Sequence, residues 1–216
     1  MPTKLLSDCR LYGFIDTAYL ENRDAAAVAR ELIDGGADVI QVRAKKSSHA
    51  QRVEIGLKVV SVAAEAEVPV IINDDVDAAF ESGADGLHLG QEDWEHLGGR
   101  AERAERLANM RIVGLSTHSL EQALRAERDG VDYIGVGPVF PTATKPGTKA
   151  VGVELIRKVA EGIKIPFFAI GGITPENVGE VLSAGATRVA VVSALLRTSD
   201  VRSATAAFKR RLELAR

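Results

Sequence analysis

Short apolar runs alternate with segments of helical periodicity along the whole chain. The runs are five or six residues long and almost continuous in hydrophobic side chains, as in "DVIQVR" and "RVAVVS". Parallel strands covered on both faces have this pattern, because neither face meets water. The pattern predicts about eight strands, at residues 11–16, 38–43, 69–73, 86–90, 111–116, 133–137, 166–171 and 188–193.

A recurring phrase marks the point where a helical segment gives way to a strand. It reads "DGGADVIQVR", "ESGADGLHLG", "RDGVDYIGVG" and "SAGATRVAVV". Each copy carries Gly where a helix should stop, because Gly enters the left-handed conformation at little cost, and each then runs into an apolar strand. Helical periodicity lies between the strands, for example at residues 24–33, 49–66, 174–184 and 201–214.

This alternation predicts the fold class. Eight helix-and-strand units in 216 residues fit a compact (β/α)₈ TIM barrel, with a doubly wound open sheet as the alternative. No stretch of linker-like composition divides the chain, so we expect residues 1–216 to form a single barrel domain.

Composition and charge exclude several classes of function. The net charge of −3 and the pI near 5.9 argue against a nucleic-acid or membrane-surface binder, which would need clustered Lys and Arg. Any anion that the protein binds should therefore be small. The single cysteine, Cys9, excludes an internal disulfide and a cysteine-rich zinc site. The sequence shows neither the apolar core of a signal peptide nor a membrane span, so we expect a cytoplasmic protein.

Polar residues gather at the predicted carboxyl ends of the strands, where barrels carry their chemistry. They include cations, carboxylates, hydroxyls and glycines, a mixture that suits a phosphorylated ligand and a divalent metal. Gly171 and Gly172 after the seventh strand and Ser193 after the eighth stand where barrels often bind phosphate. The other candidates are Gln41, Arg43, Lys45, Asn73, Asp74, Gln91, Glu92, Asp93, Ser116, His118, Thr142, Thr144 and Lys145.

Between about residues 11 and 210 the chain resembles the thiamin phosphate synthase family. The resemblance rests on separated motifs in order: "QVRAK" (41–45), "IND" (72–74), "HLGQED" (88–93), "GLSTHS" (114–119), "GPVFPTATK" (137–145), "AIGGI" (169–173) and "VVS" (191–193). It implies an enzyme that joins hydroxymethylpyrimidine pyrophosphate to a thiazole phosphate. The products would be thiamin phosphate and pyrophosphate, and the cofactor would be Mg²⁺.

The resemblance also implies roles for acidic and basic residues. Asp74 and Asp93 would hold Mg²⁺, although either could instead cap a helix, a role for which Asp75 is the better candidate. Arg43 and Lys45 would neutralise the pyrophosphate. A solvated strand end or a salt bridge at the barrel rim is the structural alternative for these two cations.

The remaining roles concern the two organic substrates. Gln41 and Asn73 would orient the pyrimidine, with Ser116 near it, while His118 would flank the next helix. Lys145 would act with Arg43 and Ser116 in catalysis by stabilising the leaving pyrophosphate, unless it is a solvated loop lysine. The thiazole phosphate would bind a further set of residues: Thr142, Thr144, Gly172, Val192 and Ser193. The two threonines could instead stabilise the turn beside Pro141 and Pro146.

The implied mechanism is a dissociative substitution without a covalent enzyme intermediate, in which the protein positions and neutralises. Ala44 stands where the family commonly has glutamate. Because side chains alternate along a strand, it should point opposite to Arg43 and Lys45, so the difference should affect packing more than contacts with the ligand. Two alternatives stay open: a thiazole tautomerase of the same superfamily, and a non-catalytic barrel that binds thiazole phosphate. We expect small-molecule substrates and a possible homo-oligomer.

Overall fold

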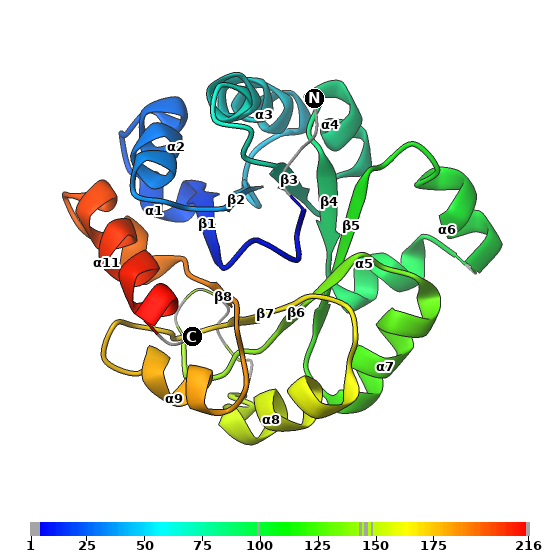
Figure 1. The fold of residues 1–216 in the computed structure, drawn as a ribbon. Helices are drawn as coiled ribbons and strands as arrows, with labels where there is room; N and C mark the ends of the chain where they lie inside the picture. Colours follow the sequence, from blue (N-terminus) through cyan, green and yellow to red (C-terminus); the bar gives the residue numbers. More distant parts are fainter. Residues whose placement is uncertain (1–4, 99, 143, 145–146, 148, 215–216) are drawn as a thin grey trace.

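A closed barrel of parallel strands forms the centre of the molecule. The computed structural model describes residues 5–98, 100–142, 144, 147 and 149–214, and among these eight strands pair in sequence order, β8 closing onto β1 (Figure 1). The TIM barrel is therefore confirmed, and the open sheet is wrong. The strands are β1 (Leu11–Asp16), β2 (Val39–Arg43), β3 (Val70–Asn73), β4 (Gly86–Leu89), β5 (Ile112–Thr117), β6 (Tyr133–Val136), β7 (Phe167–Ile170) and β8 (Val189–Ala190).

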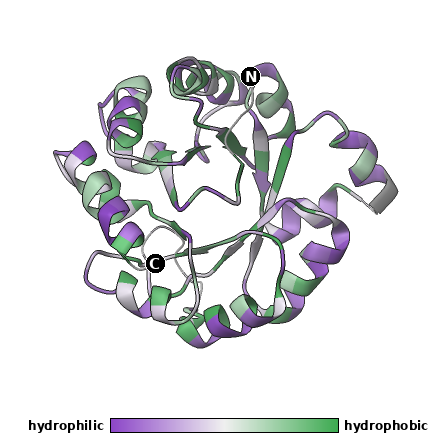
Figure 2. Ribbon diagram, in the orientation of Figure 1, coloured by the Kyte–Doolittle hydropathy of each residue, from purple (hydrophilic) through white to green (hydrophobic). Residues whose placement is uncertain are grey.

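Helices surround the barrel, and the hydrophobic residues concentrate on the strands and on the inner sides of the helices (Figure 2). Within the described ranges, no helix is long and apolar enough to cross a bilayer. The helices are α1 (Thr17–Leu20), α2 (Ala25–Asp34), α3 (His49–Ala64), α4 (Val76–Glu81), α5 (Gln91–His96), α6 (Arg100–Arg106), α7 (Leu120–Asp129), α8 (Gly152–Gly162), α9 (Val178–Ser183), α10 (Ser193–Leu196) and α11 (Val201–Leu214).

Two predicted elements are shorter in the structure by more than two residues. The eighth strand was expected over residues 188–193, but β8 ends at Ala190 because the chain turns into α10 at Val192. The helix expected from residue 174 begins at Val178, because the side-chain amide of Asn177 binds the preceding loop. Its oxygen accepts a hydrogen bond from Thr174 N, and its nitrogen donates one to Gly172 O. Both differences lie where the chain leaves the barrel to build the loops of its carboxyl end.

The recurring phrase has a structural role at the opposite end of the barrel. The aspartate in three of its copies accepts a hydrogen bond from a backbone N–H near the start of the preceding strand. This bond pins neighbouring strands in register, which is the stabilising task of the amino-terminal face of a barrel. The pairs are Asp38 with Leu11 (3.0 Å), Asp85 with Val70 (3.0 Å) and Asp132 with Val113 (2.7 Å).

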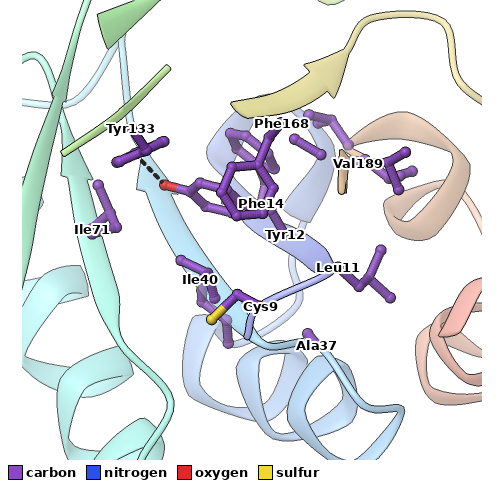
Figure 3. Close-up of a cluster of buried hydrophobic side chains, with 14 of the residues drawn as sticks. Cys9, Leu11, Tyr12, Phe14, Ala37, Ile40, Ile71, Tyr133, Phe168 and Val189 are labelled. Atoms are coloured by element: carbon purple, nitrogen blue, oxygen red, sulfur yellow. Dashed lines mark hydrogen bonds between the residues drawn. The ribbon is translucent and has the colours of Figure 1, made fainter. Parts of the chain in front are cut away.

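Aromatic side chains fill the barrel interior. Tyr12 stacks on Phe14 and meets Phe168 edge to face, with ring centroids 5.3 and 5.1 Å apart (Figure 3). The segment before β1 runs across the barrel opening (Figure 1) and buries Cys9 completely. With one end of the barrel covered, the carboxyl ends of the strands form the open face.

Candidate active site

One cavity at the carboxyl ends of the strands collects most of the predicted site residues. Asp93 lies at a second hollow beside it, and the two hollows share Lys45, Asn73 and Asp74. Lys145 lies outside the described residues. The first cavity is lined by Gln41, Arg43, Lys45, Asn73, Asp74, Ser116, His118, Thr142, Thr144, Gly171, Gly172, Val192 and Ser193, among others.

The loops after β6 and β7 approach each other closely at two glycines. Gly171 and Gly172 have φ values of 100° and 66°, in the left-handed region that favours glycine. A Cβ on Gly172 would lie 2.6 Å from the carbonyl oxygen of Pro141. Phe140 N also donates to Gly171 O (3.0 Å). Only glycine therefore allows the two loops to pack backbone against backbone at the cavity wall.

The loop after β6 presents two hydroxyl groups to the cavity. Thr142 Oγ1 accepts from Thr144 N at 3.2 Å, which is the turn role considered above, but this bond leaves the Thr142 hydroxyl hydrogen free to donate. Thr144 Oγ1 lies 2.9 Å from the hydroxyl of Tyr19 in α1. No sequence pattern singled out Tyr19, which ties this loop to α1, directly after β1.

Arg43 is held by a carboxylate that the sequence analysis also missed. Its Nη1 lies 2.6 Å from Asp16 Oδ2, and Asp16 is 1% exposed at the end of β1. Asp16 also accepts from Ala18 N at the start of α1. The pair fixes the guanidinium at the cavity wall and cancels its net charge. Arg43 can therefore donate directed hydrogen bonds to a ligand, but it contributes little net electrostatic attraction.

Asp74 and Asp93 face each other beside Lys45. Asp74 Oδ2 lies 3.0 Å from Lys45 Nζ. The backbone of Asp74 has a left-handed φ of 64°, which is uncommon for a residue other than glycine. Burial and the neighbouring charge of Asp74 raise the pKa of Asp93, although hydrogen bonding to Gly90 N–H opposes the shift. The pair thus holds negative charge that a cation would stabilise.

This donor set fits Mg²⁺, which is commonly held by one or two carboxylates together with substrate phosphates and water. Across the described parts of the chain, no group of three or more His, Cys, Asp or Glu side chains could hold a metal by itself. Asp93 has part of the capping role too, since it lies in the first turn of α5 and reaches back to Gly90. Asp74 caps no helix.

Asp75 is the helix cap, as predicted. It accepts from Ala78 N at the start of α4 and also binds Arg52 and His49. Although partial burial opposes the shift, these hydrogen bonds lower the pKa of Asp75. His49 lies between Asp75 and Glu81, and both raise its pKa.

Ala44 is buried and faces the second hollow. Its side chain is 4% exposed, and its carbonyl oxygen accepts from Arg52 Nε at 3.2 Å. Gln41 and Arg43 line the first cavity instead, and Lys45 lies at both hollows. Ala44 therefore lies on the side of this segment opposite to Gln41 and Arg43, as the alternation of side chains predicted.

Gln41 and Ser116 are joined through the barrel by side-chain hydrogen bonds, here called the interior chain. Gln41 Nε2 donates to Tyr12 Oη at 2.9 Å, and the Tyr12 and Tyr133 hydroxyls are 2.9 Å apart (Figure 3). His88 completes it, with Nδ1 2.9 Å from Tyr133 Oη and Nε2 2.9 Å from Ser116 Oγ. The sequence analysis missed the three middle residues, because polar side chains within apolar strands read as core.

His118 flanks a helix, as expected. Ser119 is the N-cap of α7, His118 N donates to Gln122 Oε1 at 2.7 Å, and the imidazole Nδ1 lies against Gly137 O. The ring lines the cavity. Gln91 also has a supporting position, since its Nε2 donates to Ser116 O at 2.6 Å.

Comparison with known proteins gives one consistent result. A family model described as thiamine monophosphate synthase matches residues 11–195. A thiamine-phosphate synthase of Chloroflexus aurantiacus is 42% identical over 198 residues, 91% of this chain and 89% of that protein. A thiamine-phosphate synthase of Halalkalibacterium halodurans is 40% identical over 209 residues, 96% and 97% of the two chains.

A solved structure agrees with the sequence comparisons. The thiamine phosphate pyrophosphorylase of Pyrococcus furiosus superposes with a TM-score of 0.86 at 36% identity, covering 98% of this chain and 99% of that one. The fold, the motifs and these relatives point the same way. The chain belongs to the thiamine monophosphate synthase family and is a transferase of the thiamine-phosphate synthase type.

Proposed function

We propose that this chain condenses 4-amino-2-methyl-5-hydroxymethylpyrimidine pyrophosphate with 4-methyl-5-(2-hydroxyethyl)thiazole phosphate, or its carboxylated form, to give thiamin phosphate and pyrophosphate. One observation supports this most directly. A single cavity has basic and amide side chains at its β2–β3 side, and hydroxyls and glycines at its β6–β8 side. Two separate anion-binding ends in one cavity suit a reaction between two phosphorylated substrates.

The β2–β3 side is the proposed pyrophosphate end. Arg43 and Lys45 donate charge-assisted hydrogen bonds, and Asn73 adds neutral ones. Lys145 is proposed to stabilise the charge that builds on the leaving group, which is where electrostatic catalysis is most effective. This assignment of Lys145 rests on its place in the "TATK" motif.

Asp74 and Asp93 are the proposed ligands of Mg²⁺. When bound there, the ion would supply positive charge to the pyrophosphate oxygens. Lys45 orients Asp74, with which it pairs at 3.0 Å. The two aspartates fit this role because their own repulsion is relieved by a shared cation.

The β6–β8 side is the proposed thiazole phosphate end. Thr142 and Thr144 donate hydroxyl hydrogen bonds, and the loops after β7 and β8 donate backbone N–H groups. Gly172, Val192 and Ser193 belong to those loops and line the same cavity.

The chain's own residues position the pyrimidine between these ends and exclude water from it. Gln41 and Ser116 are proposed to bind the aminopyrimidine through complementary hydrogen bonds. The electron-rich ring shares positive charge as pyrophosphate leaves, and the thiazole nitrogen then attacks the methylene carbon. No covalent bond to the enzyme is formed, so positioning and neutralisation carry the catalysis.

The direct test is to mix purified protein with both substrates and Mg²⁺ and to detect thiamin phosphate by chromatography. Product is expected only when all three are supplied. Isomerisation of a thiazole precursor without condensation would instead identify a tautomerase. Binding of thiazole phosphate with no turnover in any mixture would identify a non-catalytic binding protein.

A second test concerns the metal ligands. Asp93→Asn removes one charge with little change of shape, so the protein should stay folded while the Mg²⁺ concentration needed for half-maximal rate rises. Glu92→Gln removes a charge from the same helical turn at an exposed position and is the matched control. Equal Mg²⁺ requirements for the two variants would make Asp93 a helix-capping residue only.

A further inference from the structure

The interior chain is buried along its middle. Tyr12 and Tyr133 are 2% and 1% exposed, Gln41 is 3% exposed and His88 is 8% exposed. Burial raises the pKa of both phenols, so each keeps its proton and both donates and accepts. Because each phenol has one hydrogen to donate, the two buried hydroxyls are both satisfied only if the bonds through them run in one direction.

The first bond sets that direction. Gln41 Nε2 is a donor only, so the Tyr12 oxygen accepts and its hydrogen must go to Tyr133. Tyr133 then donates to Nδ1 of His88, which places the imidazole proton on Nε2. Nε2 in turn donates to Ser116 Oγ, which leaves the serine hydrogen for another acceptor.

The backbone is shaped to hold this arrangement. A Cβ on Gly114 would lie 2.1 Å from Cζ of Tyr133, so the phenol crosses β5 only because residue 114 is glycine. Gly135 faces His88, where a Cβ would be 3.5 Å from Cε1. Gln91 fixes the main chain of Ser116 through the serine carbonyl oxygen. The sequence thus makes room for the Tyr133 ring at Gly114, whereas a side chain at position 135 would be in ordinary contact with His88.

We propose that the interior chain makes Ser116 a hydrogen-bond donor and Gln41 a carbonyl acceptor toward an aminopyrimidine substrate. Such a ring offers an amino group that donates and ring nitrogens that accept, so the two ends of the chain match it. Tyr12, Tyr133 and His88 are positioning residues, since they act through Ser116 and Gln41. This inference rests on the proposed function and names what selects its pyrimidine.

The opposite direction makes a distinct prediction. If the Gln41 amide were reversed, every bond would reverse, His88 would carry its proton on Nδ1, and Ser116 would offer only lone pairs. The ring tautomer of His88 therefore reports the direction of the whole chain. It is measurable in the protein without any substrate.

The first experiment records long-range ¹H–¹⁵N correlation spectra of ¹⁵N-labelled protein. The chain has four histidines, and His88→Gln identifies the His88 signals by their loss. We expect a neutral imidazole with a protonated Nε2 and an unprotonated Nδ1. A protonated Nδ1, alone or in an imidazolium, would overturn the proposal.

The second experiment cuts the chain. Tyr133→Phe and Tyr12→Phe keep the ring volume and remove one hydroxyl each, and both should shift His88 toward a mixture of tautomers. The Tyr12 variant is the sharper test, because that residue bonds Tyr133 and not His88. Tyr19→Phe removes the remaining tyrosine hydroxyl, outside the chain, and should leave the His88 signals as they are.

Steady-state kinetics complete the test. In Tyr133→Phe, kcat/KM for the pyrimidine pyrophosphate should fall about tenfold, equivalent to ~1.4 kcal/mol, while KM for thiazole phosphate stays unchanged. An unaltered His88 spectrum in both chain variants, or equal losses for both substrates, would overturn the proposal. A wild-type protein that shows the expected tautomer but forms no thiamin phosphate would refute the proposed function instead and leave the chain's direction established.

Discussion

Replacing Gly172 by Ala tests whether the contact between the loops after β6 and β7 shapes the proposed thiazole phosphate end of the cavity. The substitution has two separable costs. A left-handed φ of 66° costs a residue with a Cβ roughly 1–2 kcal/mol. The new Cβ would also lie 2.6 Å from Pro141 O and 2.7 Å from Phe140 Cβ, and overpacking of this kind costs roughly 1–3 kcal/mol.

Gly130 separates these costs. It has φ 83° at the C-cap of α7, and a Cβ there would meet nothing within 4 Å. Gly130→Ala should therefore lose only the conformational part, about 1–2 kcal/mol. Gly172→Ala should lose about 2–5 kcal/mol in all, the sum of the two ranges.

The assay is urea unfolding followed by circular dichroism, with the two variants and the wild type compared at their midpoints. KM for thiazole phosphate is measured on the same preparations. Because relief of the clash pushes the Thr142 loop outward, Gly172→Ala should raise that KM, whereas Gly130→Ala should keep the wild-type value. Equal destabilisation by both substitutions, with equal KM, would show that the loop yields freely and that the close approach does not shape the site.

Three further predictions follow from single contacts. Thr142→Ala with Thr144→Ala should raise KM for thiazole phosphate by about tenfold or more with little change in kcat, because those bonds form equally in ground and transition states; a fall in kcat alone would contradict this. Asp38→Ala should destabilise the fold by about 3 kcal/mol or more, since its carboxylate accepts from two backbone N–H groups and Lys209, whereas exposed Asp34→Ala should stay within ~0.5 kcal/mol. His49→Gln should lower the unfolding midpoint at about pH 5.5 but not at about pH 9, because two carboxylates raise the pKa of His49 in the folded protein. The charged imidazole therefore stabilises the fold fully below the pKa of the unfolded state and no longer above the pKa of the folded state. An equal loss at both pH values would refute the charge argument.

The fold was predictable because it depends on repeated local signals. Each strand is an apolar run, and helices α2, α4, α7 and α9 each end within two residues of a Gly with positive φ. The larger errors lie at β8 and at the start of α9, where the barrel gives way to loops. The aspartates of the recurring phrase could have been found as well. Their spacing after the Gly is constant in three copies, and a polar residue before a buried strand must find a partner.

The site was predictable only where a residue follows a strand. Arg43, Thr142 and Ser193 end or follow apolar runs, and all three line the cavity. Asp16, Tyr133 and His88 acquire their partners from strands far away in sequence. Pairing between distant strand ends depends on the register of a closed barrel, which no local pattern contains.

The charges at the proposed pyrophosphate end explain why a metal belongs to the proposed function. Within the described residues, Arg43 is neutralised by Asp16 and Lys45 by Asp74, while Asp93 adds a third carboxylate. These two cations are outnumbered by the three carboxylates, so they act mainly as hydrogen-bond donors held in place at the cavity wall, and Lys145 is the proposed further cation of this end. A divalent cation between the two aspartates would reverse that balance. Removing Asp93 should therefore weaken cation binding without disturbing the donors, and this is why its effect is expected in the Mg²⁺ requirement first.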